Sequence, residues 1–260
     1  YLSLLRMLSY VGLTTLEGAM GTIQVINGAL CIRARNRGEL LSTFVRPAAE
    51  GKNPGAYVAE PKRGFKNNIV SFDANSLYPN VMISLNTSPE TKVGKVNVID
   101  DKVIINHVSG KQFNLDRPAF AKFLKEEQCA LSKAGFLFTQ KKKGIIPEFL
   151  EYYYNKRVEI KKRLFIVKQR YKKEPKNTEL KYEVERLNTE QMVIKILVNS
   201  CYGYMGNKRA PIGDDDIASS VTLTGQAVIK QSNIFIKQFL KQELPDITDH
   251  DLEQCIVYND

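Results

Sequence analysis

Two long helical segments separated by a short break constrain the fold of this chain more than any other feature. Residues 148 to 173 and residues 178 to 201 have helical character, and the sequence KKEPKN lies between them. Pro175 in this break lacks the backbone N–H that a helix interior requires. At about 25 residues and 1.5 Å per residue, each segment spans roughly 36 Å. Because the connection is short, we expect a long antiparallel helical hairpin.

Most of the net positive charge of the chain falls on this hairpin. The 260-residue chain has a formal net charge of +10, and the stretch from Lys141 to Lys176 has 13 Lys and Arg against 4 Asp and Glu. A local excess of this kind favours a surface that faces a polyanion such as nucleic acid. A solvated helix face is the alternative that composition leaves open.

Cysteine, histidine and hydropathy argue against several classes of protein. None of the four cysteines forms a C-x-x-C pair, and the chain has two histidines, which argues against a Cys/His zinc site and for a reducing compartment. The uncharged stretch from Gly18 to Ile32 has 15 residues. A membrane span needs roughly 20. We therefore expect no membrane association.

The segments on both sides of the hairpin mix helices with strands. Before the hairpin, one helix is expected between a cap at Asn27 and a closing Gly38, a second after the turn that follows residue 72, and a third capped by Asp116. The acids in GDDDI fit the N-terminus of a long helix better than a metal cluster, because of the helix dipole. Strands are expected at 56 to 59, 69 to 72 and 256 to 258, and a β-hairpin between 93 and 115.

Three side chains on the second long helix form a candidate binding stripe. Lys195, Asn199 and Tyr202 are spaced i, i+4 and i+7, so one helix face presents all three. A cation, an amide and an aromatic ring suit the phosphate, base edge and base face of a nucleotide. A lysine beside core residues is the alternative interpretation. Gly203 is expected to end the helix.

The first long helix and the segment before it add charged candidates. Arg157 and Lys161 are spaced i, i+4 and repel each other mildly unless an anion lies between them. Across the hairpin from Lys195 they could converge on a triphosphate. Asp73 follows a short apolar run and, taken alone, could be either a metal ligand or a turn residue.

Three ordered motifs in this chain resemble those of the family B DNA polymerases. DANSLYP resembles motif A, KILVNSCYG resembles motif B, and VYND resembles the first half of motif C. The basic hairpin lies between the first two, as the fingers do in this family. PGAYVAEP, NTSPET, GIIP and YNKRVEIKK further resemble the replicative polymerases of T-even-like phages.

The resemblance implies an α+β fold and a division into parts. An N-terminal helical segment with a linker would occupy residues 1–53, on the exonuclease side. A partial palm with an antiparallel sheet would occupy residues 54–145 and 207–260, with the helical-hairpin fingers inserted at 146–206. Because VYND stops before the Thr-Asp-Ser of motif C, we expect an internal fragment of the polymerase that is inactive by itself.

The resemblance also implies roles for individual residues. Asp73 and Asp260, with the Ala74 carbonyl, would bind two Mg²⁺ ions, and Lys195 would protonate the leaving pyrophosphate. Phosphate contacts would come from the Ser76 and Leu77 amides and from Arg157, Lys161 and Lys195. Tyr78 would exclude a 2′-hydroxyl, while Asn199 and Tyr202 would pack near the nascent base pair.

The same resemblance implies the partners and leaves two alternatives. Primer-template DNA, dNTPs, a sliding clamp and replisome proteins are expected, in the cytoplasm of a bacterial host if the gene belongs to a phage. One alternative is a non-catalytic basic helical hairpin that binds nucleic acid, which would need no converging acids. The other is a protein-primed family B enzyme, for which the 65 residues that follow Lys195, up to Asp260, leave little room.

Overall fold

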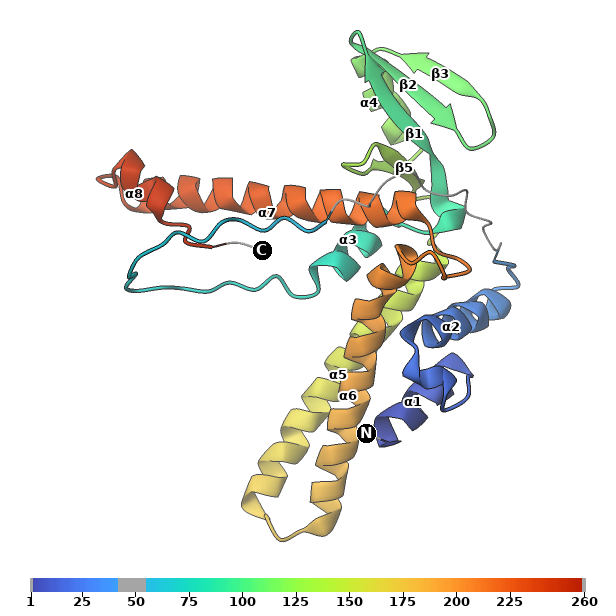
Figure 1. Ribbon diagram of the computed structural model, residues 1–260, viewed down its shortest axis with the longest axis vertical. Helices are drawn as coiled ribbons and strands as arrows, with labels where there is room; N and C mark the ends of the chain where they lie inside the picture. The colour runs from blue at the N-terminus through green and yellow to red at the C-terminus, as the bar shows by residue number, and fades with distance from the viewer. Residues whose placement is uncertain (1, 42–54, 259–260) are drawn as a thin grey trace.

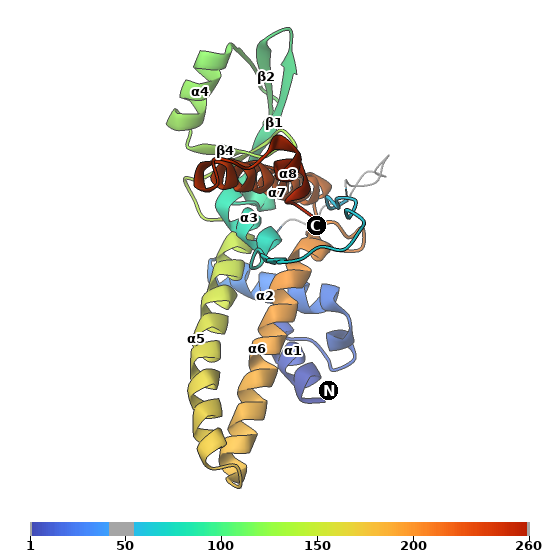
Figure 2. The same ribbon diagram turned by 90° about the vertical axis from the view of Figure 1, so that its left-hand side faces the viewer.

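The computed structural model describes residues 2–41 and 55–258 and combines helices with one antiparallel sheet (Figure 1). This mixture agrees with the α+β class predicted from the sequence. The long helical hairpin lies at one end of the molecule and the sheet at the other, with a third long helix crossing between them (Figures 1 and 2). The N-terminal helices lie against the side of the hairpin.

The predicted hairpin is confirmed as helices α5 (Ile145–Lys173) and α6 (Thr178–Met205). Asn177 caps α6, and its side-chain oxygen accepts hydrogen bonds from the Glu179 and Leu180 amides. Capping satisfies donors that the first helical turn would otherwise leave open. Ion pairs Lys156–Glu190 and Arg163–Glu183 join the two helices across the hairpin.

The expectation that Gly203 ends the second helix is wrong. Helix α6 continues through Gly203 to Met205, and Gly206 is its C-cap. The next two side chains, Tyr204 and Met205, are buried in the main core. Keeping the helix intact is what buries them, and this outweighs the roughly 1 kcal/mol that a helical glycine costs relative to alanine.

Three short N-terminal elements pack on the base of the hairpin: α1 (Leu2–Gly12), the 3-10 helix η1 (Gly18–Met20) and α2 (Thr22–Asn36). The expected helix at this place is confirmed, although it begins before Asn27. Glu148 of α5 holds α2 through Arg33 and Arg37, at 3.3 and 3.0 Å. The N-terminal segment is therefore tied to the start of the hairpin by charge as well as by apolar packing.

The sheet has five antiparallel strands in the order β3-β2-β1-β5-β4. The strands are β1 (Lys92–Ile99), β2 (Lys102–His107), β3 (Gln112–Leu115), β4 (Cys129–Leu131) and β5 (Phe136–Thr139). The predicted hairpin at 93 to 115 is confirmed and gains a third strand. Helix α4 (Arg117–Glu126) follows, and Asp116 caps it as expected, accepting from the Ala119 amide at 2.7 Å.

Strand β5 serves two cores because its side chains alternate between the faces of the sheet. Phe136 and Phe138 belong to the main core with the hairpin, α2 and the start of α7. Leu137, on the opposite face, packs with Val103 and Ile105 of β2 in a smaller core covered by α4. The sheet is thereby fixed to the helical part of the molecule through one strand.

The remaining helices are α3 (Leu77–Leu85), the 3-10 helix η2 (Pro89–Thr91), α7 (Asp215–Glu243) and α8 (Asp249–Gln254). The interpretation of GDDDI as a helix N-terminus is confirmed. Asp214 caps α7, accepting from the Asp216 and Ile217 amides. Lys92 of β1 binds Asp214 at 2.6 Å and Asp216 at 3.0 Å.

The strands expected at 56 to 59, 69 to 72 and 256 to 258 are absent from the described structure. Residues 55 to 76 form an extended segment that runs out along α7 and returns to α3 (Figure 1). Single hydrogen bonds from Gln226 to the Gly55 carbonyl and from the Lys62 amide to the Val257 carbonyl hold it. A strand requires a ladder of such bonds with a neighbour, and residues 55 to 76 form no ladder with any other described part of the chain.

No helix in the described part of the chain is both long enough and apolar enough to cross a membrane.

Candidate functional site

Helix α6 presents the predicted stripe at its end nearest to α3 and α7. Lys195 and Asn199 are exposed and Tyr202 is half-buried. The opposite face of the same turns carries the core residues Ile194, Leu197, Val198 and Cys201. Because the two faces differ so sharply, the polar stripe is open to a ligand rather than being part of the core.

The two cations of α5 lie further along the hairpin. The ion pairs Lys156–Glu190 and Arg163–Glu183 set the register, which brings residue 189 level with Arg157. Lys195 is therefore six residues from that level, about 9 Å along the axis, and Lys161 is one turn further on. The three predicted cations follow one another along the hairpin instead of meeting at one point.

Arg157 is distinguished by an unsatisfied hydrogen-bond donor. Its Nε atom is buried and has no hydrogen-bond partner within the described structure. A buried donor without an acceptor costs about 1–3 kcal/mol. An anionic ligand that reordered this side chain would relieve that cost.

The segment around Asp73 is open to solvent. Asp73 and Ala74 are exposed at the end of the extended segment, and Ser76 has a left-handed backbone with φ of 52°. The Asn80 side chain donates to the Asn75 carbonyl at 2.8 Å and closes the turn. Helix α3 then begins at Leu77, so the first backbone N–H groups of this helix lack intrahelical acceptors.

Tyr78 joins this segment to the hairpin. Its ring lies 4.5 Å from the ring of Tyr202, measured between centroids, at an interplanar angle of 45°. Burial, with Tyr202 as a smaller contribution, raises the pKa of Tyr78 above its ordinary value. The structure thus brings together two predicted site residues that are far apart in the sequence.

Helix α7 adds two residues to this place that the sequence analysis missed. Thr222, fully buried, lies 2.6 Å from the Tyr202 hydroxyl, measured to its Oγ1. Gly225 is buried against the Tyr78 ring. The sequence has no specific signal for Gly225, because a glycine inside a helix does not by itself mark a close neighbour: a Cβ atom at Gly203 of α6 would meet nothing within 4 Å.

A metal site is not found among the described residues. No group of three or more His, Cys, Asp or Glu side chains in residues 2–41 and 55–258 could hold a metal ion. Asp73 offers one carboxylate of the type that Mg²⁺ prefers. Asp260, the second predicted ligand, lies outside the described residues. The donors are of the right type, but within the described structure the set is incomplete.

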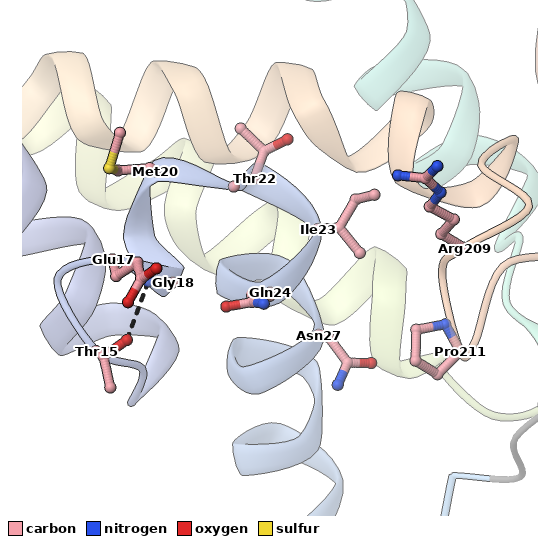
Figure 3. A pocket seen from close by; sticks show the side chains of 11 residues that line it. Thr15, Glu17, Gly18, Met20, Thr22, Ile23, Gln24, Asn27, Arg209 and Pro211 are labelled. Carbon is pink, nitrogen blue, oxygen red and sulfur yellow. Dashed lines mark hydrogen bonds between the residues drawn. The ribbon is translucent and has the colours of Figure 1, made fainter.

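A cavity of about 870 Å³ lies elsewhere, between η1, α2 and the loop after α6 (Figure 3). Arg209 and Asn27 line it, and Asn27 accepts a hydrogen bond from the Tyr204 hydroxyl at 2.8 Å. None of the predicted site residues lines this cavity. A shallower hollow on α5, lined by Lys161 together with Val158 and Phe165, does include one of them.

Comparison with known proteins places the chain in a family. A family model described as DNA polymerase family B matches residues 21–260. DNA polymerase 1 of Pyrococcus abyssi is 31% identical over 175 residues, which cover 67% of this chain and 18% of that protein. The DNA-directed DNA polymerase of Enterobacteria phage T4 is 27% identical over 229 residues, covering 73% of this chain and 24% of that protein.

A solved structure agrees with these matches at the level of the fold. The family B DNA polymerase of the hyperthermophilic archaeon Pyrobaculum calidifontis aligns with a TM-score of 0.61 and 22% identity, over 91% of this chain and 27% of that chain. The chain spans about a fifth of the length of the curated relatives it matches. Because the family model matches nearly its whole length, this chain belongs to DNA polymerase family B.

Proposed function

We propose that the chain is the central part of a DNA-directed DNA polymerase, which adds dNTPs to a primer 3′ end. The observation that carries the proposal is the contact between Tyr78 and Tyr202. It joins the helix that follows the DANSLYP turn to the helix that carries Lys195 and Asn199. We infer that Asp73 and Lys195, both exposed, face the same substrate from these two elements. Template-directed synthesis needs such a combination, since the reaction transfers a nucleotidyl group from a polyanion.

The triphosphate would lie along the hairpin cations. Lys195, Arg157 and Lys161 follow one another along it, and their charges would neutralise successive phosphates. The unpartnered Arg157 Nε supports an anionic ligand at this level. The Ser76 and Leu77 amides, at the N-terminus of α3, would donate to phosphate oxygens at the other end. Lys195 would also give a proton to the leaving pyrophosphate.

The nucleoside would lie at the paired rings. Tyr78 would pack under the sugar and exclude a 2′-hydroxyl. Asn199 and Tyr202, on the same face of α6, would border the nascent base pair. A ring edge is well suited to this selection, because it admits hydrogen and rejects hydroxyl by steric overlap alone.

Asp73, with the Ala74 carbonyl and Asp260, would hold the two Mg²⁺ ions. When bound, these ions would supply activation of the primer hydroxyl and neutralisation of charge on the pyrophosphate. Asp73 is exposed just before the turn that leads into α3, so its carboxylate is available for such a role. Because the chain spans only about a fifth of the length of its relatives, we expect the 260-residue chain alone to bind DNA weakly, in a salt-sensitive manner, without extending a primer.

In the terms of the family, residues 146–206 would be the fingers and residues 54–145 and 207–260 the palm. Residues 1–53 would belong to the exonuclease side. Primer-template DNA and dNTPs are the proposed substrates. A sliding clamp, replisome proteins and a location in the cytoplasm of a bacterial host stay predictions.

Primer extension with Mg²⁺ tests the proposed function in the complete polymerase. Asp73→Asn preserves the shape of the side chain but removes its charge, and we expect extension to fall on the order of 100-fold or more. Asp101→Asn, in the exposed turn between β1 and β2, is the matched control and should have no effect. Wild-type extension by Asp73→Asn would contradict the proposed metal role of Asp73. Absence of extension by the unmodified complete protein would contradict the proposed function and favour the non-catalytic binding hairpin.

A further inference from the structure

Helix α7 supports the paired tyrosines through two residues that have no part in the proposed chemistry. Helices α3, α6 and α7 meet at this place, and each contributes to it (Figures 1 and 2). Tyr78 comes from α3 and Tyr202 from α6, while Thr222 and Gly225 face them from α7. The inference below rests on the proposed role of Tyr78 in sugar selection.

Gly225 sets how close the Tyr78 ring lies to α7. A Cβ atom added at Gly225 would lie 2.8 Å from Tyr78 Cε1 and 3.3 Å from Cδ1. Gly225 has ordinary helical dihedrals, so an alanine would suit the backbone well. The absence of a side chain is therefore required by the ring, not by the helix. An alanine would push the ring edge outward by about 0.6 Å to restore an ordinary 3.4 Å contact.

Thr222 fixes the other ring. Its hydroxyl donates to the Ala218 carbonyl at 2.9 Å. Since threonine has one hydroxyl hydrogen, the hydrogen in the 2.6 Å contact with Tyr202 must come from the Tyr202 phenol. Tyr202 is thus tethered to α7 as a donor. Its oxygen keeps only acceptor capacity for any ligand that reaches it.

Together these contacts restrict movement of the Tyr78 ring toward α7 and toward Tyr202. Its edge meets Gly225 on one side, and Tyr202 lies 4.5 Å away on another. Tyr202 in turn cannot retreat without breaking its bond to the fully buried Thr222. The ring is half-buried, so its remaining open side is the one available to a nucleotide.

We propose that Gly225 and Thr222 are positioning residues for sugar selection: Gly225 sets the depth of the Tyr78 ring, and Thr222 holds Tyr202 behind it. A ring displaced toward the nucleotide would leave less room for any sugar, and least for a ribose. A loosened Tyr202 would let the ring yield and admit ribose more readily. The two positions therefore act on the same selection with opposite signs.

The test measures single-nucleotide incorporation of dNTP and rNTP by the complete polymerase. Gly225→Ala should raise the KM for dNTP on the order of tenfold, because displacements below 1 Å at a reacting site have effects of this size. It should lower the ratio of rNTP to dNTP kcat/KM and leave kcat within about twofold. Thr222→Val, which keeps the shape but loses the hydroxyl, should raise that ratio about threefold.

Three controls separate positioning from a general loss of structure. Thr222→Ser keeps the hydroxyl and should restore the wild-type ratio. Ser232→Ala, on an exposed turn of α7, should change neither constant. In a Tyr78→Ala background, Gly225→Ala should have no further effect, since the ring that it would meet is gone.

The outcomes distinguish this inference from the proposed function beneath it. If Tyr78→Ala raises rNTP use while Gly225→Ala and Thr222→Val leave the ratio at the wild-type value, the positioning role is overturned and the role of Tyr78 stands. If Tyr78→Ala itself leaves the ratio unchanged, both are overturned. If Gly225→Ala acts equally with and without the Tyr78 ring, its effect is on the helix alone and the inference fails.

Discussion

The helical hairpin and the extended segment from 55 to 76 carry the two halves of the proposed site, and they are built in opposite ways. In α6 the polar stripe is presented by a helix whose reverse face is buried. In the extended segment Ile69, Val70 and Phe72 are 64%, 72% and 83% exposed, and the backbone has no ladder partner in the described structure. A helix completes its backbone hydrogen bonds within itself, whereas an extended chain depends on a neighbour.

Helix α7 connects these two regions and shows the same contrast along its length. Its first half is buried against α3 and α6, with Ile217, Val221 and Thr222 in the core. Its second half exposes Phe235 and Phe239, each at 60%, and runs beside the extended segment. The buried half of α7 therefore packs against the paired tyrosines, whereas the segment that leads to Asp73 lies beside the exposed half.

The largest expected effect comes from breaking the anchor of α7. Lys92→Met leaves the carboxylate of Asp214, whose side chain is 6% exposed, without its cation. Removing one partner of a buried pair costs about 3–5 kcal/mol of unfolding free energy. Denaturant unfolding measures it. Arg117→Met, which breaks an exposed pair with Asp101, is the control and should cost less than about 1 kcal/mol.

The same pair predicts a pH dependence. Burial lowers the pKa of Lys92, but Asp214 and Asp216 together raise it more, and the net shift is upward. The stabilisation should therefore be complete below the unfolded pKa of about 10.4 and be lost as pH rises through the higher folded value. The difference in unfolding free energy between wild type and Lys92→Met should stay roughly constant from about pH 6 to about pH 9. It should become smaller above about pH 10.5. A difference that vanishes near neutral pH would contradict the assignment.

The next effect concerns the groups on the hairpin. In the complete polymerase, Arg157→Ala or Lys195→Ala should raise the KM for dNTP and lower kcat, each costing about 2–4 kcal/mol of transition-state stabilisation. Steady-state incorporation kinetics measure this. Lys172→Ala, near the tip of the same hairpin, is the matched control. If all three variants have the same kinetics, the triphosphate does not lie along the part of the hairpin that carries Arg157 and Lys195.

A smaller effect is expected at the point where the two regions meet. Tyr78→Ala should admit ribonucleotides and retain dNTP use, raising the rNTP to dNTP ratio of kcat/KM by about 10- to 200-fold, as for other small steric differences in a pocket. Competing incorporation measures the ratio. An unchanged ratio would mean that Tyr78 only packs against Tyr202 and α7.

The smallest effect should come from the extended segment. Phe72→Ala removes a ring that is 83% exposed, so unfolding free energy should change by less than about 0.5 kcal/mol. Leu197→Ala, in the core beneath the α6 stripe, should cost about 2–5 kcal/mol. Comparable losses for both variants, in denaturant unfolding of this chain, would show that the extended segment is covered in solution and would remove the contrast.

The sequence by itself determined the helical part and the identity of most candidate residues. Local rules predict features that act within a few residues: the break at Pro175, the cap at Asp116, the helix N-terminus at GDDDI, and the spacing of Lys195, Asn199 and Tyr202. The ordered motifs identified the family, which the comparisons confirm. The β-hairpin between 93 and 115 was also accessible, because its strands are neighbours in the chain.

Tertiary structure decided what depends on residues distant in the sequence. Apolar runs at 69 to 72 and 256 to 258 have strand character, but pairing decides whether a strand forms, and no pairing is present in the described structure. Gly203 does not end its helix, because the burial of Tyr204 and Met205 outweighs its propensity. The positions of Thr222 and Gly225 behind the paired tyrosines follow from the meeting of three helices, which no local pattern encodes.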